Sequence, residues 1–309
     1  MGRTPEDRRP IARVFVAKAL YNLSTTRILI ELLHTMSNLR MICGFIRKRG
    51  ISSESTFSWT FAEFARTGLG DKVHAALVEE HLKNQLIGHI ARDATAIKGN
   101  EKPLKKEKKE RVPKRRGRPK KTEVRELKEE KRLDQQMSQT SLEALQDIPR
   151  HCDVGTKKNA KGYKETWTGF KAHIDTADCG LPVNVVLTSA SLHDSQVAVP
   201  IMKMTSERIT YLYDLMDSAY DAKQIRGVSR SLGHVPIIDK NLRKGNMIPM
   251  APAEALRYNE RTAVERTNGR LKEEFGGNNV MVRGHAKVKL HLMFGIITLF
   301  ADQLLRLAL

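Results

Sequence analysis

Three acidic side chains occur where the chain could bind divalent metal ions. Asp93 closes the alternating run LIGHIARD and Asp217 closes the apolar run ITYLYDLMD, so each is predicted to end a strand. If these strands are neighbours, their ends meet at one sheet edge. Glu265 lies on a long helix, predicted from about residue 253 to 274, that could pack across that edge. Carboxylate oxygens suit Mg²⁺, and paired ions catalyse phosphoryl transfer. The alternative is that both aspartates are only polar strand ends.

The predicted helix that carries Glu265 also presents a phenol and two cations. Three and four residues separate Tyr258, Arg261 and Glu265. Lys272 follows seven residues later, so all four side chains lie within roughly 60° of one another on a helical wheel. Such a face combines a carboxylate for metal with side chains suited to phosphates. The alternative is a charged surface in which Arg261 and Glu265 form an ordinary i,i+4 pair.

The charge of the chain indicates a polyanionic partner. The 309 residues include 54 Lys and Arg against 35 Asp and Glu, a net charge of +19. Three cysteines without C-x-x-C spacing support neither a disulfide scaffold nor a zinc finger. No segment resembles an export signal, and the apolar C-terminal run LHLMFGIITLFADQLLRLAL carries charged residues, so it is predicted as a buried amphipathic helix. We therefore expect a cytoplasmic protein whose partner is nucleic acid.

The pattern divides the chain into two domains. Residues 1–85 are predicted as an all-helical N-terminal DNA-binding domain, with an ordinary helical bundle as the alternative. Residues 86–309 are predicted as an α/β domain interrupted by a basic linker insertion at about 98–160. In this second domain the expected order is strand, insertion, strand, strand, helix, strand, helix, strand, helix. A turn at Gly180 would join the second and third strands.

The linker concentrates positive charge. Residues 102–121 hold twelve basic and two acidic residues, which is more than half of the net charge of the chain. At the centre, Arg116-Gly117-Arg118-Pro119 matches the core of an AT-hook, whose arginines enter the minor groove of A·T-rich DNA. The alternative is a disordered linker that binds any phosphate backbone. The candidate DNA-binding residues are Lys114, Arg115, Arg116 and Arg118.

Taken together, these motifs resemble the DDE transposases of bacterial insertion sequences, which have an RNase H-like core. The Y-x-x-R-x-x-x-E-x-x-x-x-x-x-K signature of that family is present as Tyr258, Arg261, Glu265 and Lys272. The blocks HIARDATAI and DLMDSAYDA resemble those around the first and second aspartates of the family, and the similarity extends to CDVGTKKNAKGYKETWTGFKAHID, SASLHDSQ and ERTNGRLKEEFGG. The chain begins close to its first helical block, whereas relatives commonly carry more residues there.

The resemblance implies a fold, a reaction and a set of roles. The fold would be α/β, an RNase H-like mixed-sheet core preceded by the helical domain. Asp93, Asp217 and Glu265 would be the catalytic, metal-binding triad for Mg²⁺, with Mn²⁺ able to substitute. Tyr258, Arg261 and Lys272 would hold DNA around the scissile phosphate. The enzyme would cleave element ends and transfer them into target DNA, as a homodimer in the DNA complex and in association with the bacterial nucleoid.

Other interpretations of the same residues differ in their consequences. A nuclease without strand transfer would have the same core, and an inactive transposase-derived DNA-binding protein would be expected to lose a triad carboxylate. Asp214 is the rival of Asp217 for the second position, although strand alternation places it on the opposite face. The adjacent residues His193, Asp194 and Ser195 are predicted as a helix cap and not as a hydrolase triad.

Two further groups of residues could bind a ligand: a set of histidines and cysteines, and a set of lysines. The set His151, Cys152, His173 and Cys179 does not have the spacing of a zinc site. Four lysines of the segment before the second strand would face DNA or form a solvated loop: Lys157, Lys158, Lys161 and Lys164.

Overall fold

The structure of the protein is a computed structural model that describes residues 7–105, 131–158, 162–241 and 249–308. The AT-hook-like segment and Lys161 lie outside the described residues, so the predictions made for them stay predictions.

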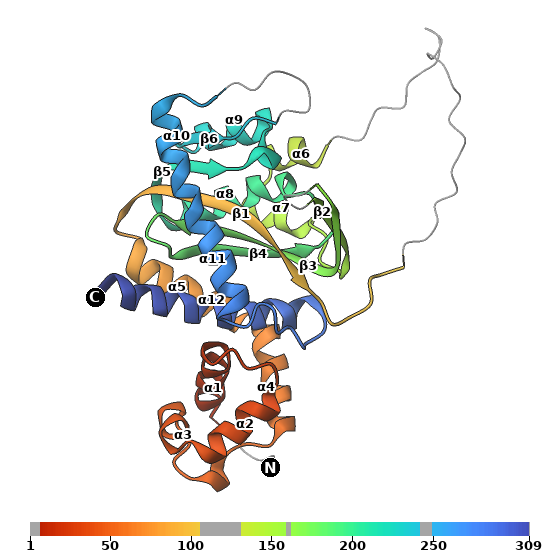
Figure 1. Cartoon of the computed structure of the whole chain (residues 1–309), viewed down its shortest axis with the longest axis vertical. Coiled ribbons are helices and arrows are strands. Elements are labelled where there is room, and N and C mark those ends of the chain that lie inside the picture. The colour runs from red at the N-terminus through yellow and green to blue at the C-terminus, as the bar shows by residue number, and fades with distance from the viewer. Residues whose placement is uncertain (1–6, 106–130, 159–161, 242–248, 309) are drawn as a thin grey trace.

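One mixed sheet organises the larger part of the molecule (Figure 1). Strand β1 is antiparallel to β3 and parallel to β5, and β5 is parallel to β6. The long strand β3 pairs with β2 along its first half and with β4 along its second half. The six strands are β1 (Leu86–Lys98), β2 (Asp153–Lys158), β3 (Lys164–Ala177), β4 (Pro182–Ser189), β5 (Thr210–Met216) and β6 (Val235–Ile238).

The strand and helix order agrees with the expectation, and the α/β, RNase H-like fold class is confirmed. The turn between β3 and β4 contains Gly180 with φ of +82°, a left-handed conformation that glycine adopts without strain. The sequence did not predict β2. Asp153 and Gly155 of this strand are buried, and its other four residues are exposed. A strand this exposed forms because β3 supplies its hydrogen-bond partners.

Helices cover both faces of the sheet. Helices α8 (Ser195–Arg208) and α9 (Lys223–Ser231) pack on the face that presents Met216 and Ile238. Helices α11 (Thr262–Glu273) and α12 (His285–Ala308) pack on the face that presents Ala91 and Leu215. Because side chains alternate along a strand, Asp93 and Asp217 share the α11 face. Figure 1 shows α11 crossing in front of the sheet.

The single helix predicted from about residue 253 to 274 is wrong in one respect. The chain forms α10 (Pro252–Tyr258), a 3₁₀ turn η3 (Asn259–Arg261) and then α11. Helix α10 contains no buried residue, whereas α11 buries five. The α-helical pairing is therefore interrupted where the chain passes from the exposed segment to the one that packs on the sheet.

The helical N-terminal part shares its core with the C-terminal helix. Phe15 contacts Phe61 and the α12 residue Phe294, at ring-centroid distances of 4.9 and 5.5 Å. Thr25 and Ser53 cap two of these helices, since each accepts a backbone hydrogen bond in the first turn of its helix. The division into domains at residue 85 stays a prediction. The helices are α1 (Arg9–Leu20), α2 (Thr26–Thr35), α3 (Ser37–Cys43), α4 (Glu54–Thr67) and α5 (Leu69–Leu82).

The predicted linker insertion contains ordered elements at its end. Helices α6 (Arg132–Ser138) and α7 (Ser141–Gln146) precede β2. A capping box begins α7, because Thr140 accepts from the Glu143 backbone and the Glu143 carboxylate accepts from the Thr140 backbone.

Helix α12 is long and apolar enough to cross a membrane by length and composition alone. Sixty-one per cent of its most apolar window is buried within the protein, against the sheet and the N-terminal helices. It is therefore the predicted buried helix, and its apolar character is explained by packing.

Candidate active site

Asp93 and Asp217 lie side by side on neighbouring parallel strands. The last residues paired between β1 and β5 are Arg92 and Met216, so the two aspartates occupy the next position along each chain. The prediction that Asp93 ends its strand is wrong. Asp93 lies inside the 13-residue β1, which continues beyond β5 because β3 pairs with it as far as Lys98.

The two carboxyl groups influence each other. The pKa of Asp93 is raised to about 6, mainly by burial and also by the charge of Asp217, although the backbone N–H of Ala94 and the guanidinium of Arg261 act in the opposite direction. Burial also raises the pKa of Asp217, which caps η2 (Ser218–Tyr220) by accepting from Ala219 N–H at 2.9 Å. Burial raises the pKa of a carboxyl group because it penalises the charged form, and a nearby positive charge offsets that penalty.

Glu265 of α11 is held by a cation from the preceding turn, η3. Its carboxylate forms an ion pair with Arg261, and its side chain is 51% exposed. Among the described residues, no three His, Cys, Asp or Glu side chains gather closely enough to hold a metal ion. The structure thus brings together two of the three predicted carboxylates and places the third on the helix that crosses them.

The predicted phosphate-binding side chains surround the aspartate pair. Arg261 lies 5.8 Å from the centre of the Tyr258 ring, and its charge acts on both Asp93 and Asp217. Burial raises the pKa of the Tyr258 phenol to about 12, so this side chain stays a neutral donor. Burial lowers the pKa of Lys272, which also interacts with the charges of Lys157 and Asp93. The charges of Arg261 and Lys272 both interact with Asp93, although η3 interrupts the predicted helix.

Asp214, the rival for the second position, has a structural environment. It is fully buried on the opposite face and accepts hydrogen bonds from Tyr211 at 3.1 Å and Ser229 at 2.6 Å. The buried guanidinium of Arg92 bridges it to Asp175, with contacts of 3.3 and 2.6 Å. These partners satisfy both of its oxygens, so Asp214 has no lone pair directed at the α11 face.

Comparison with protein families agrees with this geometry. Residues 84–301 match the family described as the transposase DDE domain, which covers most of the chain and both aspartates, together with Glu265. The chain belongs to the transposase DDE domain family. A search of curated proteins and a search of solved structures each found no match. Family membership makes this a transposase-type protein that acts on nucleic acid, with DNA as its partner.

Two residues near the transposase carboxylates were not predicted to belong to the site. Asp194 precedes α8 and its charge raises the pKa of both Asp93 and Asp217. The sequence predicted a helix cap here, but the Asp194 side chain forms no cap hydrogen bond. It accepts instead from Lys171 Nζ at 2.8 Å. The other is Asn268 on α11, whose amide Nδ2 donates to Asp93 at 3.0 Å. The sequence does carry a signal for Asn268, because it is a polar residue in the apolar stripe between Val264 and Leu271.

The rejected clusters are separated in space. His193 contacts Ser195 at 2.8 Å while Asp194 pairs with Lys171, so the three residues form no relay. His173 is buried and bonds Thr188 at 3.0 Å. The described residues, which include His151, Cys152, His173 and Cys179, contain no group that could hold a zinc ion.

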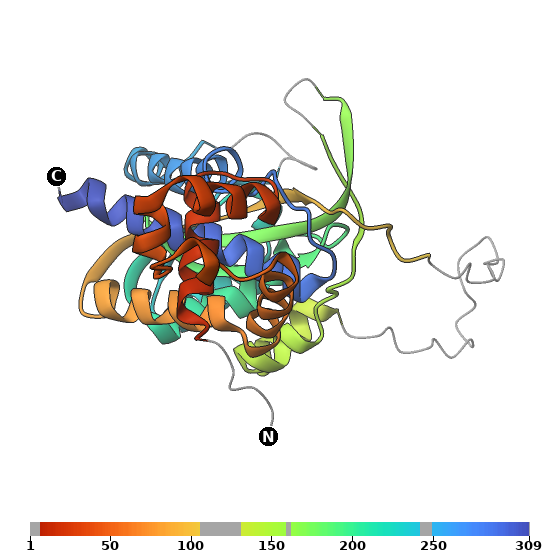
Figure 2. The same ribbon diagram turned by 90° about the horizontal axis from the view of Figure 1, so that it is seen from below.

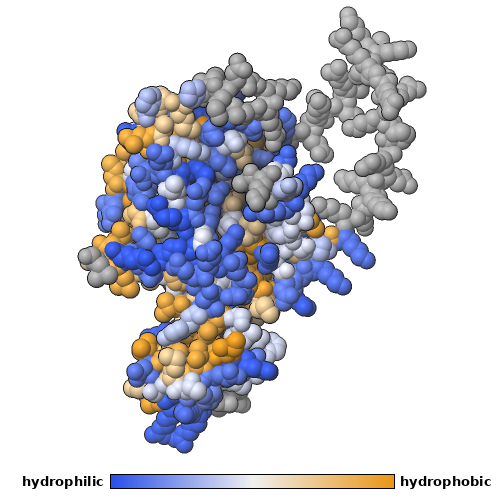
Figure 3. Space-filling view, viewed as in Figure 1, coloured by the Kyte–Doolittle hydropathy of each residue, from blue (hydrophilic) through white to orange (hydrophobic). Residues whose placement is uncertain are grey.

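The β2–β3 hairpin projects from the body of the transposase (Figure 2). Its described lysines, Lys157, Lys158 and Lys164, are exposed near the end of the hairpin. Lys157 also forms an exposed ion pair with Glu165 at 3.7 Å. The face in Figure 3 is mainly hydrophilic where α11 crosses the sheet, which suits an open, polar site for a charged polymer.

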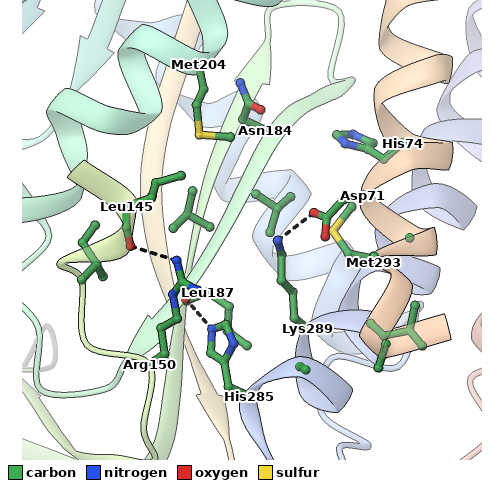
Figure 4. Close-up of a pocket in the computed structure, with 18 of the residues that line it drawn as sticks. Asp71, His74, Leu145, Arg150, Asn184, Leu187, Met204, His285, Lys289 and Met293 are labelled. Carbon is green, nitrogen blue, oxygen red and sulfur yellow. Dashed lines mark hydrogen bonds and ion pairs between the residues drawn. The ribbon is translucent and has the colours of Figure 1, made fainter. Parts of the chain in front are cut away.

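A separate cavity of about 240 Å³ lies between α5, α12 and β4 (Figure 4). Its cations already have partners in the protein. Lys289 pairs with Asp71 at 2.8 Å, Arg150 donates to the Leu145 carbonyl at 2.9 Å, and His285 bonds the Leu187 carbonyl at 2.8 Å. No predicted site residue lines this cavity.

Proposed function

We propose that this protein is an insertion-sequence transposase that cleaves the ends of its element and joins them to target DNA. The proposal assigns catalysis to Asp93, Asp217 and Glu265. It is carried by one observation: two aspartates of neighbouring parallel strands lie beneath a helix that presents a carboxylate and an arginine.

The donor set of the site fits Mg²⁺ or Mn²⁺. Asp93 and Asp217 supply carboxylate oxygens, and the buried Oδ1 of Asn268 has no hydrogen-bond partner among the described residues. Hard cations prefer such oxygens. When bound, the cation would neutralise phosphate charge and activate the attacking oxygen. Glu265, half exposed beside the pair, is the third carboxylate available to it.

Arg261 is assigned a double role in this proposal. In the protein alone it neutralises Glu265 and lies beside Tyr258. A DNA phosphate competes for the same guanidinium, since arginine binds carboxylates and phosphates with the same geometry. Binding of DNA would therefore release Glu265 toward the aspartates and hold the scissile phosphate with Arg261.

Lys272 extends the DNA path from the carboxylates toward the hairpin. It lies close enough to Lys157 for their charges to interact. The basic linker leaves the end of β1 and returns to α6. We assign the hairpin lysines and the linker to the phosphate backbone, because clustered lysines and arginines release counterions from DNA. The helical part at residues 1–85 is proposed to bind the element ends.

Two element ends must be held together for joining, so we propose a homodimer in the DNA complex. A cytoplasmic location, with the protein on the bacterial nucleoid, follows from the same partner.

The test is DNA cleavage in Mg²⁺ or Mn²⁺, on DNA that spans the gene and its flanks. The wild type should cut at the element ends and yield joined products with target DNA. Glu265→Gln should bind DNA and stay folded without cutting, whereas Glu273→Gln, an exposed carboxylate change on the same helix, should cut normally. Cutting without joined products would indicate a nuclease. Binding without any cutting by the wild type would indicate an inactive DNA-binding protein.

A further inference from the structure

We propose that Asn268 is a positioning residue that orients the Asp93 carboxylate for metal binding. This inference rests on the proposed function, because it assigns a partner to one of the metal-binding carboxylates.

The contact joins two buried parts of the molecule. Asn268 is 7% exposed, and its Nδ2 donates to Oδ2 of Asp93 at 3.0 Å. Asn268 comes from α11 and Asp93 from β1, 175 residues apart in sequence. The bond uses one lone pair of Oδ2, and the carboxylate keeps further lone pairs for a cation. A carboxylate held in this way loses less orientational entropy when it binds a metal.

The rest of the Asn268 amide has no structural use. Its Oδ1 is buried and has no hydrogen-bond partner among the described residues. An unsatisfied buried oxygen costs stability, and an apolar residue would pack better between Val264 and Leu271, which are fully buried on the same stripe. The cost is explained if this oxygen accepts from water that a cation brings into the site.

Asn268 also links the metal site to the third carboxylate. Glu265 precedes it by three residues, so both side chains lie on adjacent positions of the α11 surface. Fixing Asn268 on Asp93 therefore fixes the height at which α11 presents Glu265 over the aspartate pair. The same bond would set the position of Glu265 relative to Asp93.

The experiment compares two substitutions with opposite effects on packing and on hydrogen bonding. Asn268→Leu fills the space with an apolar side chain and removes the donor. Asn268→Ala removes the donor but leaves room for a water molecule that can replace it. The full-length protein is titrated with Mn²⁺ at fixed pH, free Mn²⁺ is measured by electron paramagnetic resonance, and Tm is measured on the same samples.

We expect Asn268→Leu to weaken Mn²⁺ binding by about 10- to 100-fold and Asn268→Ala to weaken it less. The order of Tm should be the reverse, with the alanine variant the least stable because it leaves a cavity. A purely structural role would make Mn²⁺ affinity follow Tm. Thr267→Val, a buried change one residue away on α11, should leave Mn²⁺ affinity unchanged.

Asp93→Asn separates this inference from the function on which it rests. If Asp93→Asn abolishes Mn²⁺ binding but Asn268→Leu binds within about twofold of the wild type, the positioning role is wrong and the metal site stands. If Asp93→Asn binds Mn²⁺ as the wild type does, both assignments fail. An affinity order that follows Tm also overturns the role of Asn268.

Discussion

At the scale of single residues, two aspartates three positions apart have opposite environments. Asp214 lies under α9 with its charge neutralised by Arg92 and by two hydroxyl donors. Asp217 lies on the other face, where burial and the nearby carboxylates Asp194 and Asp239 raise its pKa. The first carboxylate stabilises the fold and the second costs stability, as expected of a residue kept for binding or catalysis.

Substitution of these two aspartates should therefore separate stability from activity. Asp214→Asn leaves Arg92 buried with one acid partner fewer, and we expect a loss of about 3–5 kcal/mol in the free energy of unfolding. Asp217→Asn should unfold at the wild-type urea concentration or above it and should abolish DNA cleavage. Urea unfolding and cleavage assays on both variants check this. A stable, inactive Asp214→Asn protein would reverse the two roles.

Burial of the charged Lys18 side chain also costs stability. Lys18 lines a cavity of about 430 Å³ with Phe15 and Phe294, and burial lowers its pKa to about 8. The unfolded lysine keeps its proton up to about pH 10.4. Between pH 8 and that value the unfolded chain binds more protons, so stability from this residue rises with pH.

We expect Lys18→Met to be more stable than the wild type at pH 7, by about 1–3 kcal/mol, because methionine packs in the same space without desolvation of a charge. The difference should shrink by pH 10, where the buried lysine is neutral in the folded protein. Urea unfolding at the two pH values measures both effects. A methionine variant that is less stable at pH 7 would contradict the assignment.

At the scale of elements, function depends on exposed segments that the core does not need. The β2–β3 hairpin extends beyond the sheet, and the basic linker connects β1 to α6 without being part of either. The lysines near the end of the hairpin are exposed and add no apolar burial, so a partner explains them better than folding does. α11 combines both requirements, with Val264 and Leu271 toward the sheet and Glu265 toward solvent.

Replacing Arg116 and Arg118 of the linker by Ala should weaken DNA binding and reduce the salt dependence of the affinity. Loss of about two phosphate contacts lowers the slope of log K against log salt by about 1.8. The matched variant with Lys at both positions keeps the charge: if these residues enter the minor groove, it should lose preference for A·T-rich DNA while keeping much of the affinity. An alanine variant with unchanged affinity and slope would remove the linker from the DNA interface.

At the scale of the whole molecule, α12 and α5 join the helical N-terminal part to the sheet. Leu290 and Phe294 of α12 contribute to the core of the N-terminal helices, while Leu299 contributes to the core beneath α11. His74 of α5 bonds the Pro182 carbonyl of β4 at 2.8 Å. The N-terminal helices and the face that carries the aspartates therefore pack on one and the same helix, α12.

This joint predicts how stability depends on acid. Burial lowers the pKa of His74 to about 4, whereas the unfolded residue titrates near 6.5. Between these values the unfolded chain binds more protons, so stability falls as pH falls from 6.5 to 4. Gln at position 74 cannot titrate, so the free energy of unfolding of His74→Gln, measured by urea unfolding, should fall by on the order of 2 kcal/mol less than that of the wild type between pH 7 and pH 4.5. Parallel loss in both proteins would contradict a neutral buried His74.

The sequence by itself determined the candidate site residues and most of the element order. Spacing placed Tyr258, Arg261, Glu265 and Lys272 on one helix face, and alternation separated Asp217 from Asp214, because these are local regularities of helices and strands. It could not show that β1 continues past Asp93, that β2 exists, or that α10 and α11 are separate helices. These features depend on strand partners and burial supplied by distant parts of the chain.

Only the tertiary structure decided which side chains meet. The bond between Asn268 and Asp93 spans 175 residues, and no local pattern predicts it. Nor could the sequence show that Arg261 holds Glu265 apart from the aspartate pair, since an i,i+4 spacing permits a contact without deciding between competing partners. Which partner wins depends on burial and on the summed charges of the folded protein, and these exist only once β1, β5 and α11 have packed together.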